Sequence, residues 1–320
     1  MNKFNPRAYY RLGQSGSIFG IELMEQAENY PFKVLSADMS VVAGLDRFKK
    51  TYPENFYNVG IAEQNLLGIA AGLDSEGFKT IAVAQACFLS MRSFEQVRQY
   101  LGYMGGKVMC VGINSGFSLT FFGNTHYAIE DMSLMRSIPN MTVLSPADAG
   151  EAVKLFDAAL KVDGPVYMRL CGSLNTPIVY KEDYNLEIGK AITLKEGKDI
   201  VIFSTGLMVN NALKTAELLL GKGIEAMVVD IHTIKPIDKE CIISNCDKKL
   251  MVSIEEHNVV GGLGTAIADV LSETRNTPPL LKIGVQDQFM PVGDYNFLVE
   301  QAGLTSELIF ESVFKKLSTL

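Results

Sequence analysis

The sequence has few of the residues that build metal centres, redox pairs or disulfide frameworks. It contains five cysteines and three histidines in 320 residues. No two cysteines have the C-x-x-C spacing that is typical of zinc sites and thiol redox pairs. Most of them stand in apolar surroundings, where a thiol serves as a small hydrophobic group. We therefore expect free, buried thiols at Cys87, Cys110, Cys171, Cys241 and Cys246.

The sequence also lacks a long apolar run and a basic cluster. No stretch approaches the roughly 18 apolar residues of a membrane span, and no apolar segment follows the basic residues near the N-terminus, as a secretory signal requires. The formal net charge is −7, with 36 acidic against 29 basic residues. Since nucleic-acid binding depends mainly on clustered Lys and Arg, we expect a soluble, cytoplasmic protein that binds neither nucleic acid nor membrane.

Short apolar runs alternate with amphipathic, helix-like stretches along the chain. Hydrophobic residues make up 48% of the sequence, which is enough for a large core. Short runs rich in β-branched residues are typical of strands buried within a parallel sheet. The first predicted strands are residues 33–38, 80–84, 107–114, 141–145 and 166–170.

A polar stretch at residues 175–187 interrupts this pattern and is the predicted linker. The pattern then resumes, with predicted strands at 199–204, 226–231, 249–255 and 280–285 and a final helix at 306–316. We therefore predict the α/β class, with two domains at 1–180 and 188–320. Each domain is expected to be a mostly parallel sheet flanked by helices.

The segment Asn58–Leu73 places an acid, Glu63, at the start of a stretch that is otherwise almost wholly apolar. The apolar residues predict a buried helix. A carboxylate in the first turn gains from the helix dipole, so Glu63 needs no catalytic role to be explained. A buried carboxyl is equally suited to share a proton with a ring nitrogen of a ligand. One residue can serve both purposes.

This segment resembles the glutamate motif of the transketolase family, whose enzymes use thiamine diphosphate. The resemblance continues in order through nearly the whole chain. The matching stretches are Ser36–Asp38, Thr125–Asp131, Met135–Asp148, Tyr167–Leu170, Thr233–Asp238, Glu255–Gly264 and Gly284–Phe289. The resemblance implies a thiamine diphosphate pyrimidine-binding domain followed by the C-terminal domain of transketolase.

The resemblance also implies roles for the residues near the cofactor. Glu63 would hydrogen-bond N1′ of the aminopyrimidine and so activate the cofactor, and Phe88 would stack on the pyrimidine ring. Asp38 and Arg92 would lie close to the cofactor as well. From the residues alone, Phe88 can equally be an ordinary core residue, and Asp38 can simply end a strand in a turn.

On the substrate side, the resemblance gives His126 a catalytic role at the hydroxyl groups of donor and acceptor, which suits an imidazole that titrates near neutral pH. It assigns Arg169 to the phosphate of a sugar and includes Arg11 among the substrate-binding residues. A structural ion pair is the alternative for Arg169, because a charge in a buried strand needs a partner. A structural or interface role is expected for His232, and the role of His257 is left open.

Several substrate positions depart from the family pattern. An aspartate that reads the sugar hydroxyl in the family is replaced by Phe122. A histidine is replaced by Asn114, and a phosphate-binding serine by Val42. Exchanging hydroxyl-reading groups for aromatic and aliphatic ones removes hydrogen-bond partners from a sugar. We therefore expect a modified sugar or an unusual aldehyde as acceptor of the two-carbon ketol unit.

A G-D-G segment followed roughly 25 to 30 residues later by Asn-Asn, with which the family holds Mg²⁺ and the cofactor diphosphate, does not occur in the sequence. The resemblance therefore implies a split transketolase, in which a separate N-terminal subunit carries G-D-G and Asn-Asn. An α2β2 heterotetramer is expected from related split enzymes. Two alternatives stay open: the beta subunit of a 2-oxoacid dehydrogenase first component, and a non-catalytic regulatory subunit that retains the fold.

Overall fold

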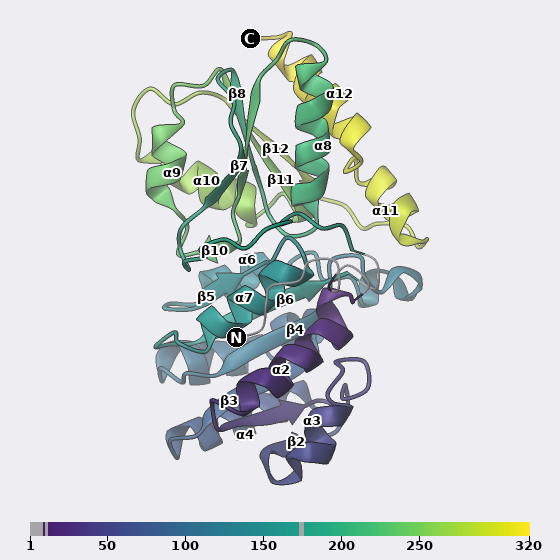
Figure 1. The fold of residues 1–320 in the computed structure, drawn as a ribbon, viewed down its shortest axis with the longest axis vertical. Helices are drawn as coiled ribbons and strands as arrows, with labels where there is room; N and C mark the ends of the chain where they lie inside the picture. Colours follow the sequence, from purple (N-terminus) through teal and green to yellow (C-terminus); the bar gives the residue numbers. More distant parts are fainter. Residues whose placement is uncertain (1–8, 10–11, 173–175) are drawn as a thin grey trace.

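A computed structural model describes residue 9, residues 12–172 and residues 176–320. It contains two β-sheets, one in each half of the chain, arranged one above the other along the long axis of the molecule (Figure 1). Helices cover both faces of each sheet, as predicted for the α/β class. None of the described helices is both long and apolar enough to cross a bilayer.

The first sheet has seven strands in the order β10-β5-β6-β4-β3-β1-β2. Its strands are β1 (Phe32–Ser36), β2 (Phe56–Asn58), β3 (Lys79–Gln85), β4 (Met109–Ser115), β5 (Thr142–Leu144), β6 (Val166–Cys171) and β10 (Thr233–Lys235). All neighbours are parallel except the pair of β10 and β5. The five predicted strands are confirmed. The short strands β2 and β10 were not predicted, and β10 comes from the second half of the chain.

The helices of the first half pack on both faces of this sheet, so its central strands are buried on both sides. They are η1 (Gln14–Ile18), α2 (Phe19–Ala27), α3 (Asp46–Thr51), η2 (Pro53–Asn55), α4 (Glu63–Ser75), η3 (Phe88–Arg92), α5 (Phe94–Gln96), η4 (Val97–Tyr103), η5 (Thr120–Thr125), α6 (Asp131–Ser137) and α7 (Ala149–Ala159). Helix α4 was expected to be buried. It buries Leu66, Leu67 and Ala70, but its other face is exposed at Gln64 and Ile69.

The second sheet has five strands in the order β12-β11-β8-β9-β7, all parallel except β7 and β9. Its strands are β7 (Ile192–Lys195), β8 (Ile200–Ser204), β9 (Ala226–Asp230), β11 (Leu250–Asn258) and β12 (Leu280–Val285). Its helices are α8 (Met208–Leu220), α9 (Lys239–Ser244), α10 (Leu263–Ser272), α11 (Tyr295–Gln301) and α12 (Ser306–Leu317). The four predicted strands and the final helix are confirmed, whereas β7 was not predicted. The division at 1–180 and 188–320 stays a prediction.

All five cysteines are free, as expected. Cys87, Cys110 and Cys171 are buried, whereas Cys241 and Cys246 are partly exposed, so the expectation of burial was wrong for the last two. Burial raises the pKa of the Cys87 thiol to about 12. This thiol is therefore inert at neutral pH.

The segment between the two sheets packs closely against both halves. Residues 176–187 form neither helix nor strand. The Asp148 carboxylate nevertheless accepts hydrogen bonds from the backbone N–H groups of Val179 and Tyr180, and the Tyr180 hydroxyl donates to Asp230 Oδ2 at 2.7 Å. Because Asp148 lies in the first half and Asp230 in the second, Tyr180 ties the two together.

The same region buries two carboxyl groups in contact. Glu151 on α7 and Asp230 on β9 are both fully buried, and burial raises the pKa of Asp230 to about 7. Burial, followed by the neighbouring Asp230 carboxyl, raises the pKa of Glu151 well above its usual value. Near neutral pH the folded chain therefore holds a proton here that the unfolded chain releases above roughly pH 4.

Stability should consequently fall as the pH rises, because the raised pKa values favour the folded state only while the pair stays protonated. We expect the free energy of unfolding to drop by at least about 2 kcal/mol for this pair between about pH 5.5 and about pH 8. Glu151→Gln should reduce this slope, as measured by urea denaturation at both pH values. Glu182→Gln, at an exposed acid of the linker, is the control. Equal slopes in the two variants would contradict the assignment.

Candidate active site

The predicted cofactor residues lie where strands β1, β2 and β3 end. Asp38 follows β1, Glu63 follows β2 at the first position of α4, and Phe88 follows β3 at the first position of η3. These strands are parallel, so their carboxyl ends meet at one edge of the sheet. Ligands of open α/β sheets bind at this edge. The chain thus brings the three residues to the place where an α/β fold forms its sites.

Glu63 is a buried carboxylate at a helix N-terminus. Its side chain is 4% exposed, and its Oε2 accepts a hydrogen bond from Arg92 Nη1 at 3.1 Å. The helix dipole of α4 also favours a negative charge at this position. Arg92 comes from η3 and is about half exposed, so the buried acid has a partner at the protein surface.

Arg92 links Glu63 to a group of aromatic rings. Its guanidinium carbon lies 4.0 Å from the centre of the Phe88 ring. The rings of Phe88 and His126 meet edge to face with centres 5.2 Å apart, and those of Phe122 and His126 have centres 4.8 Å apart. The structure thus joins the predicted cofactor residues Glu63, Phe88 and Arg92 to the predicted substrate residues His126 and Phe122.

His126 differs from the other two histidines of the chain. It is partly exposed, and its Nδ1 lies 2.8 Å from Thr125 Oγ1. His232 and His257 are fully buried, and burial lowers the pKa of each imidazole to about 4. Both are therefore neutral at physiological pH, which fits the structural role expected for His232 and indicates a similar one for His257.

Asp38 is held by a residue that the sequence did not single out. Asp38 has φ 57°, and its backbone N–H donates to Asn58 Oδ1 at 3.0 Å. Asn58 Nδ2 donates in return to Asp38 Oδ1 at 3.0 Å. Asn58 Oδ1 also accepts a hydrogen bond from the N–H of Gly60, which lies three residues before the start of α4 at Glu63. Asn58 opens the glutamate motif, so its position there was the available signal.

The predicted substrate positions Asn114 and Val42 both lie close to the segment at residues 15–16. The Asn114 N–H donates to Ser15 Oγ at 3.0 Å. Gly16 has φ 77°, and a Cβ there would lie 2.8 Å from the carbonyl oxygen of Val42. This close approach requires glycine. Arg11, the remaining predicted substrate residue, lies outside the described residues.

Arg169 has a different role from the predicted phosphate contact. Its side chain is 1% exposed, and Nε donates to both oxygens of Asp131, at 2.9 and 3.2 Å. Nη2 donates to the carbonyl oxygens of Ala128 and Glu256. The guanidinium is thus already paired with a buried carboxylate and is not left over for a phosphate. The structure therefore replaces the predicted contact by the alternative, an internal ion pair.

The second half of the chain supports the segment that carries Phe122 and His126. Asn124 and Met290 exchange two hydrogen bonds, at 2.7 and 3.0 Å. The Glu256 carboxylate accepts from the N–H of Phe117 at 2.7 Å, and the Tyr127 hydroxyl donates to the carbonyl oxygen of Pro291 at 3.2 Å. These contacts explain how an exposed aromatic segment keeps a defined position.

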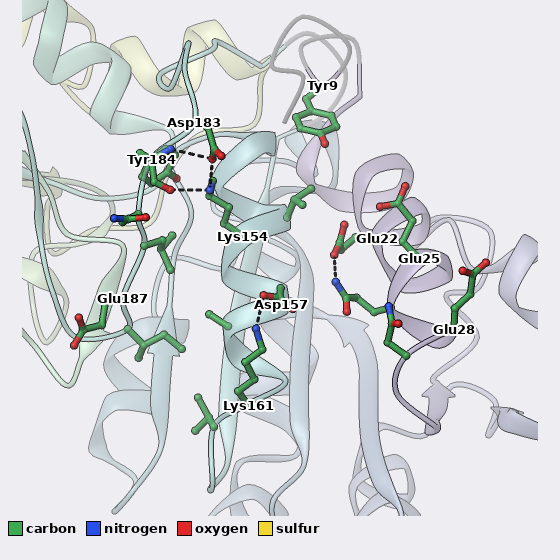
Figure 2. A pocket seen from close by; sticks show the side chains of 18 residues that line it. Tyr9, Glu22, Glu25, Glu28, Lys154, Asp157, Lys161, Asp183, Tyr184 and Glu187 are labelled. Atoms are coloured by element: carbon green, nitrogen blue, oxygen red, sulfur yellow. Dashed lines mark hydrogen bonds and ion pairs between the residues drawn. The ribbon is translucent and has the colours of Figure 1, made fainter. Parts of the chain in front are cut away.

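A separate groove of about 1100 Å³ lies between α2, α7 and residues 183–188 (Figure 2). Its lining is largely acidic, and its two lysines are paired, Lys154 with Asp183 and Lys161 with Asp157. None of the predicted site residues that the structure describes lines it. The groove is therefore not the candidate active site. In the described part of the chain, no group of three or more His, Cys, Asp or Glu side chains is placed to hold a metal ion.

Two family models match the chain in succession. The transketolase pyrimidine-binding domain matches residues 21–176, and the transketolase C-terminal domain matches residues 189–309. The two matches meet at the segment between the two sheets. Glu63, Phe88 and His126 all fall within the first.

Individual relatives agree with these models. A 6-deoxy-6-sulfo-D-fructose transketolase subunit of a Clostridium species is 40% identical over 279 residues, which cover 86% of this chain and 85% of the relative. An apulose-4-phosphate transketolase subunit of Phocaeicola vulgatus is 34% identical over 297 residues, covering 92% and 94%. A solved structure of a split-gene transketolase, described as an inactive beta4 tetramer, is 39% identical with a TM-score of 0.84, covering 94% and 97%.

The ion pair of Arg169 yields a stability prediction. Arg169→Met leaves the Asp131 carboxylate buried without its cation, which should cost about 3–5 kcal/mol of unfolding free energy. Arg98→Met removes the partner of Glu95 from an exposed pair and should change stability little. Urea denaturation of both variants measures the difference. An Arg169→Met variant as stable as Arg98→Met would contradict the structural role.

Proposed function

The chain belongs to the transketolase family, and from this we propose that it is the C-terminal subunit of a split, thiamine diphosphate-dependent transketolase. The reaction would move a two-carbon ketol unit from a ketose or ketose phosphate to an aldehyde. The observation that carries the proposal is the buried Glu63 carboxylate at the N-terminus of α4, joined through Arg92 to Phe88 and from there to His126.

The residues present fit the aminopyrimidine half of the cofactor. That ring needs a hydrogen-bonding carboxyl at one edge and an apolar surface against one face. Glu63 supplies a buried carboxyl, and its described partner Arg92 is at the surface and about half exposed. Phe88 supplies the aromatic face, which Arg92 now covers. When bound, thiamine diphosphate supplies the carbon nucleophile and stabilises the carbanion of ketol transfer.

Glu63, His126 and Thr125 would hold or transfer the protons of the reaction and orient the groups that do so. Glu63 would hold a proton at the pyrimidine edge, and burial among apolar residues of α4 would keep water from that bond. His126 is the one histidine within reach of solvent, so its imidazole would exchange a proton with the hydroxyl of donor or acceptor. Thr125, hydrogen-bonded to His126 Nδ1, would fix the orientation of the imidazole.

A partner subunit is part of the proposal. The sequence lacks a G-D-G segment followed by Asn-Asn, so Mg²⁺ and the cofactor diphosphate would be held by an N-terminal subunit in an α2β2 assembly. Exposed apolar side chains near the site support this arrangement, since Ile61 beside Glu63 is 77% exposed and Phe121 beside Phe122 is 73% exposed. Apolar surface of this kind is typical of interfaces. The inactive beta4 tetramer of the solved relative is also consistent with a subunit that needs a partner.

The acceptor is proposed to be atypical. Phe122 is an exposed ring against His126, and Val42 stands beside the segment at residues 15–16. Neither side chain can hydrogen-bond a sugar. Of the relatives described above, one is named for a sulfonated sugar and one for apulose 4-phosphate. Both names support a substrate outside the ordinary pentose phosphates, and both favour a transketolase over a dehydrogenase subunit.

Glu63→Gln tests the proposal. In the complex with the partner subunit, the amide keeps the size of the side chain but cannot hold the proton as a carboxyl does, so turnover should fall by about 10²- to 10⁴-fold. Ketol transfer is measured with a ketose donor and an aldehyde acceptor at saturating cofactor. Glu76→Gln, at an exposed acid just beyond the other end of α4, should keep full activity. Unchanged turnover in Glu63→Gln would show that Glu63 has no such catalytic role, and it would favour the regulatory alternative.

A further inference from the structure

One buried amide at the carboxyl edge of the first sheet is not satisfied. Gln85 ends β3 and is 4% exposed, and its Nε2 has no hydrogen-bond partner among the described residues. A buried N–H donor without a partner costs free energy, so such groups are rare unless a ligand or water completes them. The Gln85 amide is therefore free to donate a hydrogen bond to a ligand.

Gln85 lies beside a predicted substrate position. Strand β3 pairs with β4 so that Gln85 stands opposite Ile113, one residue before Asn114. Asn114 Nδ2 donates to Gln85 Oε1 at 3.4 Å. Asn114 has φ 54°, and its N–H is held by Ser15 Oγ. The backbone thus fixes Asn114 against Gln85, and Asn114 is partly exposed where the substrate side of the site begins.

The pair has a definite chemistry. Gln85 Nε2 offers N–H donors, and the Asn114 amide contributes both a donor and an acceptor oxygen. Neither side chain carries a charge. A neutral group that presents donor and acceptor together matches a hydroxyl, which itself donates and accepts, better than it matches a phosphate or sulfonate, for which Arg and Lys are suited.

We propose that Gln85 and Asn114 form an amide pair that binds hydroxyl groups of the substrate, taking over part of the recognition lost at Phe122 and Val42. This inference rests on the proposed function and adds a specificity-determining residue, Gln85, to it. The substrate class is then an aldehyde or ketose with hydroxyl groups on the carbons next to the reacting carbonyl.

Gln14 provides a matched comparison. It is also a buried glutamine, but Nε2 donates to the carbonyl oxygen of Pro146 at 2.8 Å and Oε1 accepts from the Cys171 N–H at 3.0 Å. Gln14 therefore serves the folded structure, whereas the Gln85 donor gains nothing from folding. A residue retained at a cost to stability is typical of a functional site.

The experiment compares Gln85→Met with Gln14→Met, since methionine keeps the length of glutamine and removes both polar groups. Thermal unfolding of the free chain is measured first. Removing the unsatisfied donor of Gln85 should leave the melting temperature unchanged or raise it, while Gln14→Met should lower it by several degrees. A loss of stability in Gln85→Met equal to that in Gln14→Met would overturn the inference.

Selectivity is measured second, in the complex with the partner subunit, thiamine diphosphate and Mg²⁺. The acceptors D-glyceraldehyde and propanal have the same carbon chain and differ in their hydroxyl groups. The unsubstituted complex should prefer D-glyceraldehyde in kcat/KM, and Gln85→Met should reduce this preference by about tenfold while keeping turnover of propanal.

An unchanged preference in Gln85→Met would overturn the amide-pair inference and leave the proposed function intact. Failure of the unsubstituted complex to turn over any ketose tried would instead remove the proposed function and the inference with it.

Discussion

The buried ion pair of Arg169 with Asp131 joins three parts of the chain that the site requires. Arg169 lies on β6 in the first sheet, Asp131 begins α6 directly after the segment that carries His126, and the Arg169 guanidinium also reaches the carbonyl oxygen of Glu256 on β11. Two charges buried together are costly to separate, since either one alone would be left without water or a partner. The position of the His126 segment therefore depends on a pair that is itself far from solvent.

This ion pair explains how the second half of the chain affects the candidate site, whose residues belong to the first half. Glu256 and Met290 contact the backbone or side chains of residues 117–124, and this segment presents Phe122 at the surface. The C-terminal domain thus acts as a support for the substrate side. The proposed cofactor side, around Glu63 and Phe88, is built within the first half of the chain, and the apolar side chain of Ile61 beside it is exposed.

The sequence predicts the long elements well and the short ones poorly. Apolar runs of five or more residues became strands β1, β3, β4, β5, β6, β8, β9, β11 and β12, because burial on both faces requires such runs. Of these, only β5 is as short as three residues. The missed strands β2, β7 and β10 have three or four residues and depend on pairing with distant parts of the chain.

For Arg169, burial predicts a partner anion but does not identify it, since Asp131 is 38 residues away. Gln85 was missed because the lack of a hydrogen-bond partner is a property of the folded chain alone.

As proposed, this chain holds one half of an active site and needs a second subunit for the other half. Ketol transfer measured for the chain alone, for the partner that carries G-D-G and Asn-Asn alone, and for their mixture tests it most directly. We expect no turnover from either subunit and full turnover from the mixture, reaching its maximum at equal amounts of the two. Turnover by the chain alone, or none by the mixture with any ketose donor, would contradict the account.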